Sequence, residues 1–451
     1  MHEIRNLAQF IVSLDNSKIP QNVLDTASRC VFDTVSCGIG ASEMRQMIDI
    51  RKVICQDTKS HDVAIWGSGE KASPACAAFL NAMSSHLLEL DDVHTKSKTH
   101  IGTVVIPSAY SMAVRQNASG QDFLCSVVCG YETASRIGMA LNVVEHRTRG
   151  WHSTATAGVF GAAAACAKLM NLNVEQTISA LGMAGMQASG LWAFLEDGAS
   201  CKVLNPARAA VNGYVAALLA SAGMTGPEHI LTAKDGGLLN AMSDGGDSSK
   251  VDRALGEVWE IMYMDNKPYP CCRSTHPSID AAIHIHNQYH FPIEDIKSIE
   301  VETYAIGKKQ CGETPGSLHP SSVSEAKFSI PYTVIAALIK GCIGLSDFTL
   351  ERITDEKIQR LLPLVTVNVS DRYTQAYPLH WSSKLIVDIS GHGTIEYEVI
   401  DPLGSPYNPL TNDEVIKKGR DLISKTYNHD DTESVISALS NLKAQKTVPI
   451  F

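Results

Sequence analysis

The sequence lacks the motifs that identify many cofactor and metal enzymes. It contains no Walker phosphate-binding loop, no Gly-x-Gly-x-x-Gly fingerprint and no His-Glu-x-x-His pair, so nothing in it indicates nucleotide, dinucleotide or zincin chemistry. Its twelve cysteines form no Cys-x-x-Cys pair and have no spacing typical of a zinc site. We therefore expect free thiols, no metal site and no cofactor.

Long apolar runs and an excess of basic residues are also missing. The run AGVFGAAAACAKLM is too short for a membrane helix and is interrupted by Lys168. The first twenty residues are amphipathic and include acids, unlike a secretory signal. A net charge of −10 argues against binding to nucleic acid, whose phosphates require a basic surface. We expect a cytoplasmic protein that binds neither membranes nor nucleic acid.

What the sequence does contain is a strong helical pattern over its first part. A chain of 451 residues with 44% apolar side chains exceeds the usual size of one hydrophobic core, which predicts more than one domain. Many of the predicted helices are rich in Ala, Gly and Ser, and small side chains let helices approach closely. Apolar residues recur at helical spacing in 102–116, 121–141, 153–171, 174–192 and 203–223.

The pattern changes after residue 265. Alternating apolar and polar residues predict half-buried strands at 296–306, 364–371, 383–391 and 393–401. Helical patterns occur at 278–289, 328–341, 411–427 and 430–443. We expect a mostly α protein with three parts: helical domain 1–265, a smaller α+β domain 266–404, and C-terminal helices 405–451 that return to the helical domain.

Four charged segments interrupt these apolar surroundings at helix ends or at the domain boundary, where sites are commonly built. They are ELDDVHTKSKTH at 89–100, RTRGWHSTATAG at 147–158, EDGASCKVLNPARAA at 196–210 and DNKPYPCCRSTHPSID at 265–280. Together they supply a cationic set that suits a small polyanion and proton transfer near neutral pH. Its members are Lys96, Lys98, His100, His152, Lys202, Lys267, Arg273 and His276.

Each of these residues also has a plainer interpretation. A histidine near a helix end is more often structural than catalytic, and a loop lysine is usually solvated. Asp91 and Asp92 could simply end a helix. The alternate histidines of IHIHNQYH do not share a helix face, which favours a surface helix over a metal site. The residues alone predict a cofactor-free, two-domain enzyme with a cationic cleft.

The charged segments resemble, in the same order, the marker segments of the MmgE/PrpD family. The resemblance rests on LLELDDVHTKSKTHIGTVVIPSAYSMA, GWHSTATAGVFGAAAACAKLMNL, ASCKVLNPARAA and KPYPCCRSTHPSIDAA, and it covers essentially the whole chain. That family includes 2-methylcitrate dehydratase, cis-aconitate decarboxylase and iminodisuccinate epimerase. It implies a large helical domain, a smaller α+β lid, a homodimer, and cofactor-independent chemistry beside a carboxylate of a small di- or tricarboxylate.

The resemblance also implies roles for the candidate residues. His100 and His152 would transfer protons, and Lys202 would hold a carboxylate during the reaction. Asp91 or Asp92 would orient a histidine or receive a substrate hydroxyl, which completes the expected catalytic set. The expected substrate-binding set is Lys96, Lys98, Lys267, Arg273 and His276.

Departures from the family pattern favour one branch over the others. The dehydratases usually carry Asn-Asp-Thr-Trp and Gly-His-Pro-Ser where this chain reads DDVHTK and THIGT, and the decarboxylases usually carry histidine where Cys272 stands. The common Lys-Arg-Leu-His-Pro-Gly-Arg-Ala-Ala is changed at Val203 and Asn205. We therefore expect an isomerase, which would epimerise an iminodisuccinate-like compound or move the double bond of aconitate.

Two other functions stay open. One is a lyase, either a dehydratase of a 2-methylcitrate-like hydroxy acid or a decarboxylase of cis-aconitate, since elimination and isomerisation share their first step. The other is a carboxylate-binding protein that no longer turns over. A purely structural protein is the weakest alternative, because it would have no reason to set these clusters at helix ends facing a domain boundary.

Overall fold

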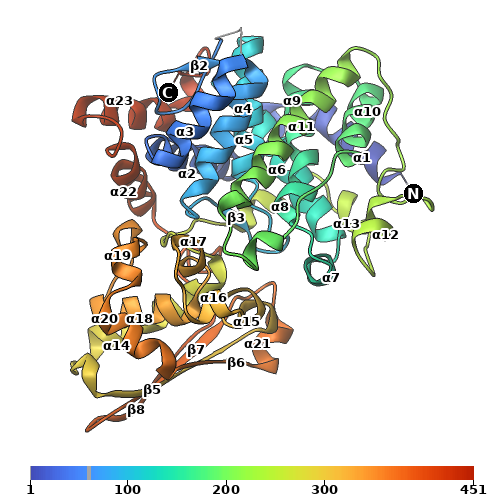
Figure 1. Cartoon of the computed structure of the whole chain (residues 1–451). Coiled ribbons are helices and arrows are strands. Elements are labelled where there is room, and N and C mark those ends of the chain that lie inside the picture. Colours follow the sequence, from blue (N-terminus) through green and yellow to red (C-terminus); the bar gives the residue numbers. More distant parts are fainter. Residues whose placement is uncertain (1, 58–61, 451) are drawn as a thin grey trace.

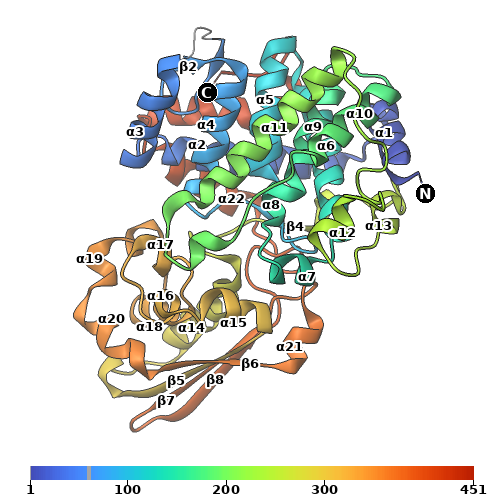
Figure 2. The same cartoon turned by 45° about the vertical axis from the view of Figure 1, so that its right-hand side comes forward.

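The computed structural model describes residues 2–57 and 62–450 and places the chain in two packed layers of unlike composition (Figure 1). A large helical domain contains both ends of the described chain, and a smaller lid contains a sheet with helices on one side. The same division is visible from a second direction (Figure 2). The structure confirms a mostly α protein with a smaller α+β part.

The first part of the chain is a succession of helices. Two short ribbons, β1 (Val63–Ala64) with β2 (Lys71–Ala72) and β3 (Val93–His94) with β4 (Met264–Asp265), accompany them. In chain order, the helices of the described residues up to 252 are α1 (Glu3–Ser13), α2 (Gln21–Ala41), α3 (Arg45–Ile54), α4 (Pro74–Leu87), α5 (Gly102–Gln116), α6 (Gly120–Ala140), α7 (Val143–Thr148), α8 (Ser153–Thr156), α9 (Gly158–Leu169), α10 (Val174–Gly185), α11 (Leu204–Ser221), α12 (Leu238–Met242) and α13 (Ser249–Asp252).

Small residues bring the central helices together, as predicted. A Cβ atom added to Gly161 of α9 would lie 2.6 Å from the carbonyl oxygen of Gly130 on α6. A Cβ added to Gly213 of α11 would lie 2.5 Å from the Cβ of Ala162. The three helices therefore cross in backbone contact, and a larger side chain at these glycines would force them apart.

Two predicted helices end differently in the structure. The helix predicted at 153–171 is divided at Ala157 into α8 and α9, and the one predicted at 174–192 ends at Gly185. After α10 the chain turns back at Gly190, whose φ of +113° suits glycine. The Gly190 carbonyl accepts a hydrogen bond from His152 N at 3.0 Å, so the loop after α10 is held against the start of α8.

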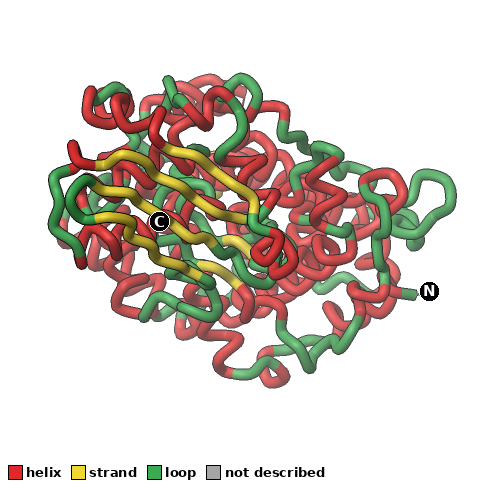
Figure 3. The backbone as a smooth tube through the Cα atoms, turned by 90° about the horizontal axis from the view of Figure 1, so that it is seen from below, coloured by secondary structure: helices red, strands yellow, loops and turns green. Residues whose placement is uncertain are grey.

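The lid is built on a four-stranded mixed sheet in the order β6-β5-β7-β8. Strand β5 (Ile296–Thr303) is parallel to β6 (Val365–Val369) and antiparallel to β7 (Ser383–Ile389), which pairs antiparallel with β8 (Gly393–Val399). Seen from below, the strands cross the near side of the lid with helices behind them (Figure 3). Helix α14 packs against β7, β8 and α18.

The remaining helices cover the inner side of the lid or return to the helical domain. Lid helices are α14 (His276–Gln288), α15 (Ala305–Cys311), α16 (Pro315–Leu318), α17 (Val323–Ala326), α18 (Ile330–Lys340), α19 (Leu350–Ile353), α20 (Glu356–Leu361) and α21 (Asp371–Ala376). The last two helices are α22 (Asn412–Ile423) and α23 (His429–Ser440), which lie beside α2 in the helical domain (Figures 1 and 2).

The two large apolar cores of the described residues support this arrangement. One gathers buried side chains from residues 4–264 and 410–448, and the other gathers residues 269–395 together with Phe194. We therefore propose that the boundaries between the helical domain and the lid lie at residues 265 and 404. No helix among the described residues combines the length and apolarity that crossing a bilayer requires.

Candidate active site

A pocket with about 540 Å³ of free space, part of it open to solvent, lies where the helical domain meets the lid. All four charged segments contribute to it, so segments far apart in the sequence meet in one site. The lining residues are Glu89, Val93, Lys98, His100, Val143, His146, Arg147, Trp151, His152, Ser153, Trp192, Lys202, Cys272, Arg273, Ser274, Gln310, Phe328 and Trp381.

Backbone pairing places the first segment against the start of the lid. The two residues of β3 pair with the two residues of β4, with Val93 opposite Asp265 and His94 opposite Met264. Lys418 of α22 donates to the carbonyl of Leu90 at 2.7 Å and so braces the same segment from the other side. The polar end of α4 is therefore held on both sides beside the pocket.

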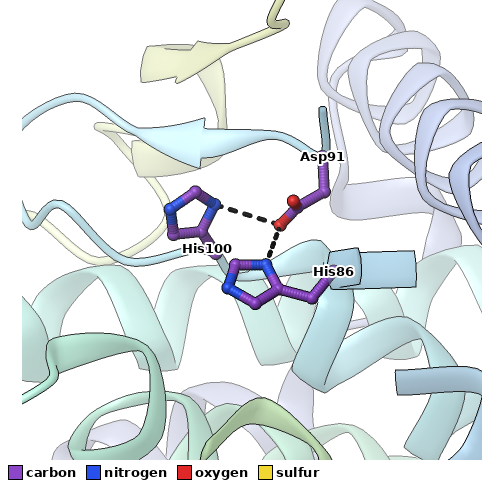
Figure 4. Close-up of side chains that lie close together, drawn as sticks. All are labelled: His86, Asp91 and His100. Atoms are coloured by element: carbon purple, nitrogen blue, oxygen red, sulfur yellow. Dashed lines mark hydrogen bonds and ion pairs between the residues drawn. The ribbon is translucent and has the colours of Figure 1, made fainter. Parts of the chain in front are cut away.

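Asp91 is not part of the pocket lining and lies between two histidines (Figure 4). Its Oδ2 accepts hydrogen bonds from Nδ1 of His86 at 2.9 Å and from Nδ1 of His100 at 3.0 Å. The backbone carbonyl of Asp92 also accepts from His100 Nδ1 at 3.0 Å. Because a carbonyl can only accept, His100 carries its proton on Nδ1, and in the neutral ring Nε2 is the basic nitrogen.

Electrostatics keep this cluster in the form that a general base requires. Burial alone would raise the pKa of Asp91, but His86 and His100 hold that pKa well below its usual range. Burial lowers the pKa of His100 to about 4. At neutral pH the pocket therefore contains a neutral His100, whose orientation is fixed by the ionised Asp91.

His152 has the opposite tautomer. Asn205 Nδ2 donates to His152 Nδ1 at 3.0 Å and to the Leu191 carbonyl at 3.2 Å, so the proton of the imidazole is on Nε2. Burial lowers the pKa of His152 well below its usual value. The ring packs edge-on against Trp192 with 4.9 Å between centroids. The pocket thus contains one histidine with a free acceptor nitrogen and one with a donor.

Glu89 connects two buried lysines from different segments. Its carboxylate pairs with the ammonium groups of Lys202 and of Lys267, the latter at 3.4 Å. Lys267 also donates to the Glu89 carbonyl at 3.0 Å. Burial alone would raise the pKa of Glu89, but the two lysines hold it well below its usual range. Two ammonium groups around one carboxylate leave a positive charge that suits one carboxylate of a ligand.

Of the predicted substrate-binding residues, Lys98 enters the pocket most directly. Its Nζ atom is buried and has no hydrogen-bond partner among the described residues. Its backbone has a φ of +55°, the left-handed region that lysine rarely adopts. Glu89 has the same unusual conformation, with φ +57°. Such strain persists where surrounding structure holds it, and it is concentrated at functional sites.

Asp92 and Lys96 are not brought into the pocket. The Asp92 carboxylate accepts from the Tyr131 hydroxyl at 2.7 Å and from the Gly102 amide at 3.0 Å, so it fixes the start of α5. Lys96 pairs with Glu260 at 2.8 Å outside the lining. Only the backbone of Asp92 therefore acts on the histidine cluster, and Lys96 is neutralised by an acid of its own.

Arg273 and His276 form a structural pair beneath the lid. The Arg273 guanidinium donates to Asp265 Oδ1 at 2.8 and 3.1 Å and to His276 Nδ1 at 2.9 Å. Arg273 lines the pocket, but its donors are used by Asp265 and by backbone carbonyls. His276 is fully buried and lies outside the lining. These two residues hold β4 to the lid.

The sequence did not predict roles for His86, His146, Arg147 or Trp192. His86 belongs to the apolar helix α4, where a histidine resembles a core residue, and only its distance of five residues from Asp91 could have drawn attention to it. Arg147 and His146 precede the Trp-His motif and lie on the short helix α7. Trp192 was assigned to a helix and instead occupies the loop beside His152.

One group among the described residues could hold a metal ion, although the sequence predicted none. His86, Asp91 and His100 offer ligand atoms within 4.8 Å of one another. Two histidines and a carboxylate are ligands that suit several transition metals. In the structure, however, Asp91 Oδ2 already accepts hydrogen bonds from both rings, so a metal there would replace those hydrogen bonds.

Cys272 brings a thiol to the lid side of the pocket. A hydrogen bond involving Cys311 is the main cause that lowers the pKa of Cys272 to about 6, and the nearby Lys267 adds to it. The twelve cysteines are free, which agrees with the prediction of free thiols. A titratable group therefore occupies this position of the lining.

Comparison with known families identifies related proteins over most of the chain. A family model described as the MmgE/PrpD N-terminal domain matches residues 5–250, and one described as the MmgE/PrpD C-terminal domain matches residues 269–443. Together the two models span most of the helical domain and of the lid, including the first three charged segments and the fourth from residue 269 onward.

Curated relatives are similar over most of their length. The cis-aconitate decarboxylase-like protein oryM of Aspergillus oryzae is 27% identical, over 98% of this chain and 95% of the relative. Cis-aconitate decarboxylase of Aspergillus terreus is 26% identical, over 91% and 87%. Mitochondrial 2-methylcitrate dehydratase of Yarrowia lipolytica is 21% identical, over 83% and 73%. The names of these relatives describe decarboxylation and dehydration.

Proposed function

This chain belongs to the MmgE/PrpD family, and from that premise we propose that it is a lyase that decarboxylates a cis-aconitate-like polycarboxylate. The relatives reported above favour a lyase over the isomerase that the departures in the sequence suggested. We therefore propose the lyase alternative in place of the isomerase.

The observation that carries the proposal is the pairing of complementary histidines with buried cations in one pocket. His100 has a free acceptor nitrogen and His152 a free donor, and both line the pocket with Lys202. Fixed cations stabilise the negative charge that develops beside a carboxylate, and a positioned histidine can move the proton. This combination suits bond cleavage next to a carboxylate.

The decarboxylation would proceed in one balanced step. The bond between carbon and the departing carboxylate breaks, and its electron pair forms a new double bond as carbon dioxide leaves. The electrons of the original double bond take up one proton at the far carbon. Lys202, supported by the buried Lys267 behind Glu89, would hold a retained carboxylate, and the bound anion would raise the pKa of His100 so that it delivers the proton from Nε2.

Dehydration is the second candidate, and the histidine tautomers suit it as well. Elimination of water requires a base for the carbon-bound proton and an acid for the departing hydroxyl. His100 Nε2 would accept the proton, and His152 Nε2–H would donate to the hydroxyl. The same two side chains therefore serve either reaction, and the group that leaves depends on the substrate.

The proposal is tested by incubating the protein with cis-aconitate in deuterated water and following products by NMR and carbon dioxide release. Decarboxylation predicts carbon dioxide and a five-carbon diacid that carries one deuterium from solvent. Hydroxy-acid substrates that lose water would support the second candidate. Deuterium exchange without loss of any group would refute the lyase and restore the isomerase.

Assembly and location complete the proposal. We expect a homodimer with a small polycarboxylate as its ligand, on the basis of the family resemblance, and a cytoplasmic location, on the basis of the sequence features described above. Light scattering measures the assembly directly, and a mass twice that of the chain is the expected result.

A further inference from the structure

We infer that Lys98 and Arg147 form a second anion subsite, which binds a carboxylate remote from the reacting carbon and makes the substrate a tricarboxylate. The inference deepens the proposed function, because the catalytic end of the pocket is the one assigned there. It concerns a different part of the lining, with its own contacts and its own test.

These two cations lack acidic partners among the residues that the structure describes. The Nζ atom of Lys98 and the Nε atom of Arg147 are buried without a hydrogen-bond partner within the described part of the chain. The other cations of the lining have acidic partners, since Lys202 pairs with Glu89 and Arg273 pairs with Asp265. Lys98 and Arg147 therefore add positive charge to the pocket that no described carboxylate balances.

Each of the two cations lies over an aromatic ring. The Lys98 ammonium lies 3.8 Å from the ring centroid of Tyr377, and the Arg147 guanidinium lies 4.3 Å from that of Trp192. An aromatic face attracts a cation without using its N–H donors. The donors of both side chains thus remain available to a ligand, which an ion pair with a protein carboxylate would have prevented.

This arrangement is energetically unfavourable in the absence of a ligand. Burial and the proximity of Arg147 lower the pKa of Lys98 well below its usual value, and burial lowers that of Arg147. Lys98 also has the left-handed backbone described above. Burying unpaired cations is unfavourable, and an apolar side chain would serve a purely structural role better. A bound anion would remove most of this cost.

Trp192 lies between the subsite and the catalytic histidines. Trp192 contacts both His152, at 4.9 Å between centroids, and the guanidinium of Arg147. Its indole therefore stands between the catalytic end and Arg147. Tyr377 follows α21 of the lid, so the subsite is assembled by both domains.

The neighbouring histidine contributes no competing charge. His146 precedes Arg147 on α7 and lines the pocket. Burial lowers its pKa to about 3, and Lys98 contributes to the shift. His146 is therefore neutral at physiological pH, and its Nε2 is paired with the Thr156 hydroxyl at 3.0 Å. The anion would meet Lys98 and Arg147 as the charged groups of this end.

The test compares two unreactive acids that differ by one terminal carboxylate, tricarballylate and methylsuccinate, by calorimetry at fixed salt. The native protein is expected to bind the triacid about 100-fold more tightly, and Lys98→Met or Arg147→Met to lose 10- to 100-fold for the triacid alone, because each removes one charge-assisted contact. Lys98→Arg should restore most of the preference. Lys417→Met, which removes an exposed lysine of α22, is the matched control.

Unchanged methylsuccinate binding shows that each variant is folded. If one of the two variants fails to fold, the other still tests the inference. Equal affinity of the native protein for both acids, no measurable binding of tricarballylate, or equal losses for both acids in the variants would each overturn the inference. Neither acid reacts, so these results do not depend on lyase activity. Conversely, a protein that releases no carbon dioxide but prefers the triacid would contradict the proposed reaction and leave the subsite intact.

Discussion

At the scale of single residues, His100 and His152 differ in which ring nitrogen carries the proton. Their partners, a backbone carbonyl with Asp91 in one case and the Asn205 amide in the other, decide it. The residue types were predictable because histidines and lysines interrupt apolar surroundings at helix ends. The partners were not, because Asn205 is 53 residues from His152 in sequence and only folding brings them together.

Asp91→Asn is predicted to lower kcat about a hundredfold or more. The amide cannot accept from both histidine rings with the strength of a carboxylate, and it removes the charge that would stabilise a protonated His100. Steady-state kinetics provide the measurement, and circular dichroism checks the fold. Asp92→Asn is the matched control, expected to retain kcat within about threefold because its side chain faces Tyr131. Equal losses in the two variants would contradict the assignment of Asp91.

Asp92 should make stability dependent on pH. Burial raises its pKa from 3.8 to about 7, so between about pH 4 and pH 7 the folded protein keeps a proton that the unfolded chain releases. Raising the pH through this window therefore reduces stability. Asp92→Asn cannot titrate, so its unfolding free energy relative to the native protein should improve between pH 4.5 and pH 8, by an amount on the order of 3 kcal/mol. Urea denaturation measures this difference in unfolding free energy between the variant and the native protein. The same difference at pH 4.5 and at pH 8 would contradict the prediction.

At the scale of elements, the small-residue helices were predictable and the loop after α10 was not. Helical periodicity continues through residue 192, but the backbone groups of that loop find partners at the start of α8, as between His152 N and the Gly190 carbonyl. Such a tertiary contact leaves no local pattern in the sequence. This loop brings Trp192 into the pocket, so the least predictable element contributes to the site.

The start of α5 is predicted to tolerate no added side-chain atoms beside the active site. A Cβ added to Gly102 would lie 2.3 Å from Thr34 Oγ1 and 2.7 Å from Asp92 Oδ1, and Asp92 in turn holds His100. Gly102→Ala should therefore lower stability by about 1 to 3 kcal/mol and kcat by roughly tenfold or more. Thermal unfolding and kinetics measure both. Gly344→Ala, whose added Cβ meets nothing within 4 Å, should change neither, and a similar effect of the two variants would refute the argument.

At the scale of the whole molecule, the site exists because two cores meet. Composition and the change of pattern near residue 265 predicted a helical domain and an α+β domain, and the family resemblance predicted that they enclose a carboxylate site. Neither could tell which charged residues face each other. Arg273 and His276 bind Asp265 and the backbone instead of facing a ligand, whereas Arg147, which received no role, lines the pocket.

The most direct measurement for the central claim, that the four charged segments form one carboxylate-binding catalytic pocket, is a crystal structure of the protein with bound tricarballylate. The account predicts the ligand between the helical domain and the lid, with one carboxylate at Lys202, another at Lys98 and Arg147, and its carbon skeleton between the Nε2 atoms of His100 and His152. A ligand bound elsewhere, or one whose carboxylates avoid these lysines while the histidines face away from it, would contradict the account.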